Sequence, residues 1–181
     1  MKKYFSNYLL FFVLLILLGV LIHIRFANKY QNENKQLIFL KKPLNLNITN
    51  LDLQSQTKSK LLIMFTLNDC PLCLFEAQNW GIAAEKLKDN VDFIGVTKDD
   101  TTNNKISDFI DEYKLNFVIY RNRKIFNELK TLLSSNGYNY NTPLKLFINK
   151  NCKIMAIEKG TKNLEKQKMF VNRVRSIFNE Y

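Results

Sequence analysis

Short apolar runs separated by polar segments fill the chain from residue 43 onward. Runs of strand length lie at 61–65, 91–97, 116–120, 144–148 and 153–158, and an alternating stretch at 44–48 predicts an edge strand. Apolar residues spaced by three and four predict helices at 71–87, 103–114, 124–134 and 164–178. Strand–helix units followed by a hairpin and a final helix predict an α/β sandwich with a mixed sheet.

A longer apolar run precedes this domain. A basic start, Met1-Lys2-Lys3, is followed by an apolar window of 19 residues at 8–26. As a helix this window is about 28 Å long, which matches the hydrocarbon core of a bilayer. A cleaved signal peptide is the alternative, but no pair of small residues follows the run as a cleavage site. We therefore expect a cytoplasmic tail at 1–7, an uncleaved transmembrane anchor at 8–26, a polar stalk at 27–42 and a folded domain at 43–181.

Composition limits the partners of the domain. The net charge of the 181-residue chain is +11, and 46% of its residues are hydrophobic, which is not a disordered composition. Lysines are spread among acidic residues, with no basic cluster that contains interleaved aromatic side chains, so we expect no nucleic-acid partner. The roughly 140 residues of the domain can bury one core without structural disulfides, which leaves the cysteines free for chemistry.

The chemistry is concentrated where the strand at 61–65 passes through a polar turn into the helix at 71–87. That helix opens with Cys70-Pro71-Leu72-Cys73. Unpaired N–H groups and the positive end of the helix dipole favour a thiolate at Cys70, so Cys70 is the candidate nucleophile. Pro71 fits the first helical position, and Cys73 lies one turn further in, where it can close a short disulfide as the resolving thiol.

A structural or inert cysteine pair and half of a structural zinc site are the alternatives for such a C-x-x-C sequence. Structural zinc needs four ligands, and the domain offers only Cys152 in addition, while the one histidine, His23, lies in the N-terminal apolar run. We therefore expect no metal and no cofactor other than a redox-active Cys70–Cys73 disulfide.

The element order, together with three motifs, resembles the thioredoxin fold, and within it the membrane-anchored TlpA and ResA type of thioredoxin-like protein. Cys70 to Glu76 matches the C-x-x-C-x-x-E motif of that family, Thr142-Pro143 matches its cis-proline turn, and 147–154 matches its strand–turn–strand ending. The resemblance covers about Pro43 to Phe178. It implies a three-layer sandwich with a mixed central sheet, preceded by one transmembrane helix.

The resemblance also implies the roles of individual residues. Pro143 would be cis and would face the two sulfurs, and Thr142, Pro71 and Leu72 would join it in binding an extended substrate peptide. From the sequence alone, the alternative for Pro143 is an ordinary trans proline in a loop. Glu76 would help to move protons during exchange; its alternative is an ordinary carboxylate on the helix surface.

Three positions depart from the family pattern. Asp69 stands where an aromatic residue is usual, and its negative charge would oppose a thiolate at Cys70. Apolar Met64 stands where thioredoxin itself has a buried acid. Cys152 replaces the usual glycine of the hairpin turn, where we expect an exposed thiol outside the cysteine pair.

These features predict a membrane-tethered thiol:disulfide oxidoreductase, a reductase or isomerase of exported proteins or cytochrome c precursors. Such chemistry is useful on the oxidising side of the membrane, so we expect the domain on the periplasmic side of the inner membrane. The resemblance to the TlpA and ResA type implies a membrane reductant relay as electron source. Peroxidase activity is disfavoured because Leu67 stands where T-x-x-C needs threonine, and a copper-delivery role would require a histidine in the domain. The alternative from another class is a redox-inactive binding or scaffold module.

Overall fold

The computed structural model describes one position in the N-terminal run, residue 19, and most of the chain from residue 37 onward. The described residues are 19, 37–46, 48, 51, 57–68, 70–98, 103–138, 141–160 and 169–179. The predicted tail and anchor at 1–26 lie outside them apart from residue 19. No helix among the described residues is long and apolar enough to cross a bilayer.

Six strands form one mixed sheet in the order β1-β6-β5-β2-β3-β4. Strands β2 (Ser59–Phe65), β3 (Val91–Thr97) and β4 (Val118–Arg121) run parallel, whereas β5 (Leu144–Ile148), β6 (Lys153–Lys159) and β1 (Leu37–Asn45) pair antiparallel. The predicted strands at 61–65, 91–97, 144–148 and 153–158 are therefore confirmed, as is the mixed sheet.

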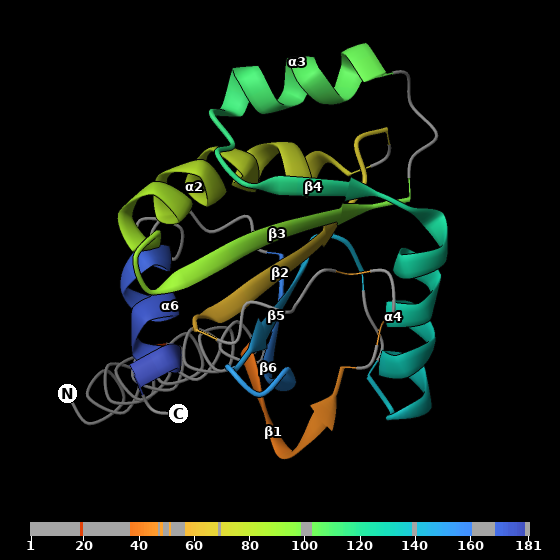
Figure 1. Cartoon of the computed structure of the whole chain (residues 1–181), viewed down its shortest axis with the longest axis vertical. Coiled ribbons are helices and arrows are strands. Elements are labelled where there is room, and N and C mark those ends of the chain that lie inside the picture. Colours follow the sequence, from red (N-terminus) through yellow and green to blue (C-terminus); the bar gives the residue numbers. More distant parts are fainter. Residues whose placement is uncertain are drawn as a thin grey trace, which may run out of the picture. The chain divides into compact units, whose positions relative to one another are not determined.

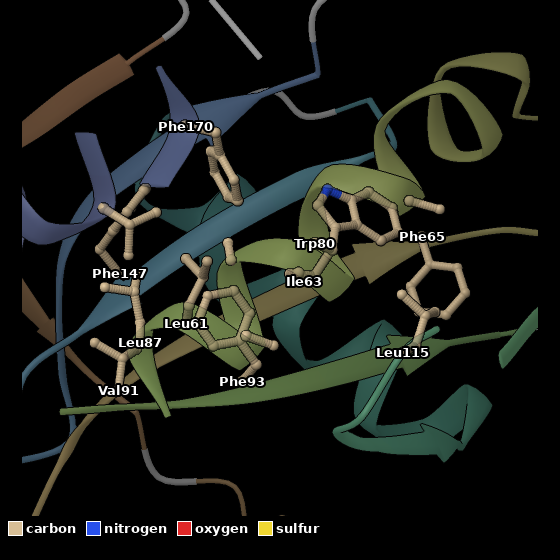
Figure 2. Packing of buried hydrophobic residues seen from close by; sticks show 14 of the residues in the cluster. Leu61, Ile63, Phe65, Trp80, Leu87, Val91, Phe93, Leu115, Phe147 and Phe170 are labelled. Atoms are coloured by element: carbon tan, nitrogen blue, oxygen red, sulfur yellow. The ribbon is translucent and has the colours of Figure 1, made fainter. Parts of the chain in front are cut away.

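Helices cover both faces of this sheet, as Figure 1 shows. One core joins the sheet to α2 (Pro71–Leu87), α3 (Asn103–Tyr113) and α6 (Phe170–Asn179), and a second core joins the other face to α4 (Arg123–Ser135). The first core contains large aromatic side chains that point into the layer between sheet and helices, and Figure 2 labels Phe65, Trp80, Phe93, Phe147 and Phe170 among them. The predicted three-layer sandwich is confirmed.

Several boundaries differ from those predicted. The edge strand predicted at 44–48 ends at Asn45, and the strand predicted at 116–120 is β4, which begins at Val118. Strand β1 includes Leu37 to Lys42, so this part of the predicted stalk belongs to the sheet, paired with β6. The register shifts between Phe39 and Leu44, and this irregularity interrupts the alternation that would have marked a strand in the sequence. The final helix is described only from Phe170, so the predicted start at Leu164 lies outside the described residues.

Candidate active site

The cysteine pair lies where buried strand β2 gives way to helix α2. The helix begins at Pro71 with Cys70 as its N-cap residue, as the sequence predicts. The Sγ atom of Cys70 accepts a hydrogen bond from the N–H of Cys73 at 3.1 Å, and the same N–H also donates to the carbonyl of Cys70 at 2.9 Å, so a donor of the first helical turn is directed at this sulfur. The same geometry that stabilises the cap would stabilise negative charge on Cys70 in the reduced protein.

Cys70 and Cys73 form a disulfide, with 5.2 Å between their Cα atoms. Cys73 is fully buried on the sheet-facing side of α2, along with Ala77, Trp80 and Leu87, whereas Cys70 is 5% exposed. Cys70 is therefore more enclosed than its position at the helix end led us to expect, yet it is still the cysteine of the pair that solvent reaches. Asp69, which was expected to oppose the Cys70 thiolate, lies outside the described residues.

The loop that carries Thr142 and Pro143 lies beside this turn because of the strand register. Leu144 of β5 pairs with Met64 of β2, so Pro143 falls level with the end of β2, the strand that leads to Cys70. The Thr142–Pro143 peptide bond is cis, as predicted. The carbonyl of Pro143 accepts a hydrogen bond of 2.8 Å from the N–H of Gly160, which ties the loop to the end of β6.

The proline ring of Pro143 leaves no room for a side chain at position 160. A Cβ atom at this position would lie 2.5 Å from Cδ and 2.6 Å from Cγ of Pro143, well inside ordinary carbon–carbon contact. Only glycine permits the end of β6 to approach the proline ring this closely. Gly160 could not be recognised from the sequence as part of the site, because the residue that requires it to be glycine lies 17 positions away.

Glu76 lies on the buried side of α2 and is not a surface carboxylate. It is 3% exposed, and its Oε2 atom accepts from the Lys145 ammonium at 2.6 Å and from the Trp80 indole N–H at 3.4 Å. Lys145 belongs to β5, two residues after Pro143, so this ion pair joins the helix of the cysteines to the strand that follows the proline loop. Whether Glu76 moves protons remains a prediction.

The outer face of α2 near the cysteines is apolar. Pro71 is exposed and Leu72 half-buried, and the two residues after Cys73, Leu74 and Phe75, are 41% and 39% exposed. Leu74 and Phe75 could not be recognised from the sequence as surface residues, because an apolar residue in a helix is usually part of the core. Their exposure adds apolar surface to the part of α2 that directly follows Cys73.

Cys152 does not belong to this site. It lies in the turn between β5 and β6, at the opposite end of β5 from Pro143, and five residues of strand correspond to roughly 17 Å. Its thiol forms no disulfide. The side chain is half-buried and packs against the second core, rather than exposed as expected, and its φ of 55° is in the left-handed region that favours glycine.

The mixed sheet, the helix-capping disulfide and the cis-proline loop beside it together define a protein of the thioredoxin fold. Among solved structures, a DsbF homologue from Corynebacterium diphtheriae is 16% identical, with a TM-score of 0.59 over 79% of this chain and 93% of its own. A thioredoxin-family thiol:disulfide interchange protein from Chlorobium tepidum is 11% identical, with a TM-score of 0.57 over 76% and 97%.

A third similar structure is a secreted disulfide oxidoreductase from Mycobacterium tuberculosis, described as homologous to E. coli DsbE. It is 20% identical, with a TM-score of 0.53 over 67% of this chain and 84% of its own. At these identities the likeness establishes the fold. No protein-family model matches the sequence, and no curated protein matches it.

Proposed function

We propose that this protein is a thiol:disulfide oxidoreductase that exchanges the Cys70–Cys73 disulfide with thiols or disulfides of other proteins. One observation carries this proposal: the disulfide caps a helix, with the Cys73 N–H directed at Cys70 Sγ, in the arrangement that favours a thiolate on the more accessible cysteine. The three similar structures named above, all described as oxidoreductases, interchange proteins or their homologues, support it.

The order in which the two cysteines react follows from their exposure, since Cys70 is 5% exposed and Cys73 is fully buried. When the protein acts as a reductase, the Cys70 thiolate attacks a substrate disulfide and forms a bond to one of its two sulfurs. The other substrate sulfur leaves with the electron pair of the broken bond and takes up a proton. Cys73 then loses its proton and attacks Cys70, which releases the second substrate sulfur as a thiol and re-forms the Cys70–Cys73 disulfide. Two electrons pass from the cysteine pair to the substrate. A dithiol reductant must restore the pair.

The substrate site is the surface around these sulfurs. Pro143 has no N–H, and its carbonyl bonds to Gly160, so backbone pairing with an extended substrate peptide falls to Thr142. Pro71 and Leu72 border Cys70, and exposed Leu74 and Phe75 widen the apolar surface beside them. This surface suits a substrate cysteine with apolar neighbours.

The direct test is disulfide reduction by the full-length chain in detergent. With dithiothreitol as electron source, it should accelerate insulin reduction, and Cys70→Ser should abolish the acceleration. Equilibration of the Cys70–Cys73 pair with glutathione buffers would give its reduction potential and separate a reductase from an oxidase. No acceleration at any pH from 6 to 9 would contradict an exchange activity.

A scaffold role without turnover is the second candidate, and the low exposure of both cysteines in the disulfide form favours it. The two roles predict different behaviour of the disulfide itself. A scaffold would leave it intact in millimolar reduced glutathione, whereas an exchange enzyme would be reduced and would form mixed disulfides with protein substrates.

We also propose that residues 8–26 anchor the domain on the extracytoplasmic side of the inner membrane, where exported proteins and a membrane reductant relay would be its partners. The support is the basic start and the 19-residue apolar window of the sequence. On cell fractionation the intact protein should be found in the membrane fraction. Protease added to intact spheroplasts should degrade the domain. Full protection, or a soluble form that starts after residue 26, would contradict the anchor.

A further inference from the structure

A lysine lies in the middle of the most deeply buried part of the sheet. Lys145 is 1% exposed, and its neighbours in β5, Leu144, Leu146, Phe147 and Ile148, are buried completely. A charge removed from water in this way is strongly destabilising unless it is paired and hydrogen-bonded. The partners of Lys145 therefore determine why a lysine is tolerated here.

Two buried carboxylates share the Lys145 ammonium. Its Nζ atom lies 2.6 Å from Oε2 of Glu76 on α2 and 3.3 Å from Oε1 of Glu158 on β6. Glu158 is in turn held by Arg173 of α6, with Nε donating to Oε2 at 3.0 Å and Nη2 to Oε1 at 2.7 Å. Two carboxylates and two cations give the cluster no net charge, and its members come from four different elements.

An aromatic ring lies against both cations of this cluster. The ring centroid of Phe170, on α6, is 5.3 Å from Lys145 Nζ and 5.5 Å from Arg173 Cζ, within the range of cation–π attraction. Phe170 is itself buried in the first core and is labelled in Figure 2. The interactions around Lys145 are thus weakly screened by water, and charges there act strongly on their neighbours.

Cys73 is a neighbour of the cluster on α2. Glu76 follows Cys73 by three residues on the same buried side of α2, and at that spacing the Cβ atoms of two helical residues are about 5–6 Å apart. An unbalanced carboxylate at Glu76 would oppose the thiolate that Cys73 must become in order to resolve a mixed disulfide. A balanced carboxylate would oppose it far less.

We propose that Lys145 is a positioning residue for thiol–disulfide exchange, which holds Glu76 in place and cancels its charge so that Cys73 can ionise and attack Cys70. Glu158 and Arg173 complete the balance, since Arg173 compensates the second carboxylate that faces Lys145. This inference rests on the proposed function and deepens it. The proton lost from Cys73 ends on the departing substrate sulfur, so no additional reactant is required.

The test is a pH titration of Cys73 in the reduced full-length chain, with Cys70→Ser and Cys152→Ser to leave one thiol, followed by thiolate absorbance near 240 nm. In this background Lys145→Met should raise the midpoint of ionisation by about one pH unit or more, because it leaves the charge of Glu76 uncompensated, and a unit charge on a residue with a Cβ spacing of about 5–6 Å acts at that scale in a partly shielded site. Glu76→Gln should lower the midpoint, because it leaves the lysine cation in excess. The double variant, Glu76→Gln with Lys145→Met, should return close to the parent.

A second buried lysine provides the matched control. Lys60 of β2 is also 1% exposed, but its side chain belongs to the opposite face of the sheet, where its Nζ donates to the carbonyl of Lys58 at 3.1 Å. Lys60→Met should therefore leave the Cys73 midpoint unchanged, even if it lowers thermal stability as much as Lys145→Met. Equal shifts in the two lysine variants would show that Lys145 acts only through general loosening of the core, and would overturn the inference.

The Cys73 midpoint is expected to shift in opposite directions in Lys145→Met and Glu76→Gln. If Lys145→Met does not fold, Glu76→Gln alone decides, because an unchanged or higher midpoint in that variant would overturn the proposal. The titration does not depend on turnover. Absence of insulin reduction together with the predicted midpoint shifts would therefore contradict the proposed function, whereas reduction without those shifts would contradict only the role of Lys145.

Discussion

Replacement of Gly160 by alanine tests whether the position of the Pro143 loop controls exchange. The added Cβ would lie 2.5 Å from Cδ of Pro143, whereas unstrained carbon atoms approach to about 3.5 Å, so the ring or the end of β6 must shift by about 1 Å. Overpacking of this kind costs about 1–3 kcal/mol of stability. Displacement of a substrate-positioning group by about 1 Å can reduce the rate about 100-fold.

We therefore expect Gly160→Ala to fold but to lose about 10- to 100-fold in kcat/KM for insulin reduction, on the scale set by such displacements. Stability is measured in parallel from urea unfolding. Gly137→Ala is the matched control, because its φ of 80° makes alanine strained, at a cost of about 1–2 kcal/mol, while no atom lies within 4 Å of the new Cβ. Similar stability losses with exchange impaired only in Gly160→Ala would support the reasoning. Normal kcat/KM in Gly160→Ala, or equal losses in both variants, would refute it.

Three further predictions follow from the structure. Cys73→Ser should accumulate mixed disulfides with substrates on non-reducing gels and Cys70→Ser few, because Cys70 is the more exposed residue of the pair; equal yields would reverse the assignment. Cys152→Gly should stabilise the protein by up to about 1 kcal/mol in urea unfolding, since φ is 55° there, with exchange unchanged; a large loss of turnover would place Cys152 in the mechanism. The hydrogen bond from Lys88 holds the pKa of Glu85 below its ordinary value of 4.5, so the contribution of Glu85 to stability is present above pH 4.5 and is lost as the pH falls through the lowered pKa. Urea midpoints of Glu85→Gln and its parent should converge in acid; a constant difference would argue against this ion pair.

The best-predicted parts of the fold are those that one local signal defines. Strand β3 was predicted at its observed bounds, Val91–Thr97, because a nearly continuous apolar run bounded by polar residues is typical of a strand covered on both faces. The start of α2 was also predictable, since proline fits the first helical position and the residue before it then becomes the cap.

The parts that were not predicted depend on distant partners. The sequence predicts a stalk that includes residues 37–42, because polar Asn, Lys and Gln residues surround a short apolar run there. Only the pairing of β1 with β6 reveals these residues as an edge strand of the sheet. Lys145 was visible as a lysine within an apolar strand. Its partner Glu76 lies 69 residues away, and no local pattern indicates which carboxylate will balance a buried cation.

The small size of the ring closed by the disulfide has a consequence for the folding thermodynamics. A cross-link restricts the unfolded chain less when it encloses fewer residues, and Cys70 and Cys73 are separated by only three positions. A ring of about four residues removes conformational entropy worth about 2 kcal/mol from the unfolded chain, against nearly 5 kcal/mol for a ring of 100. Opening the Cys70–Cys73 bond therefore restores less conformational entropy to the unfolded chain than opening a long-range cross-link would, so reduction destabilises the sheet and both cores less.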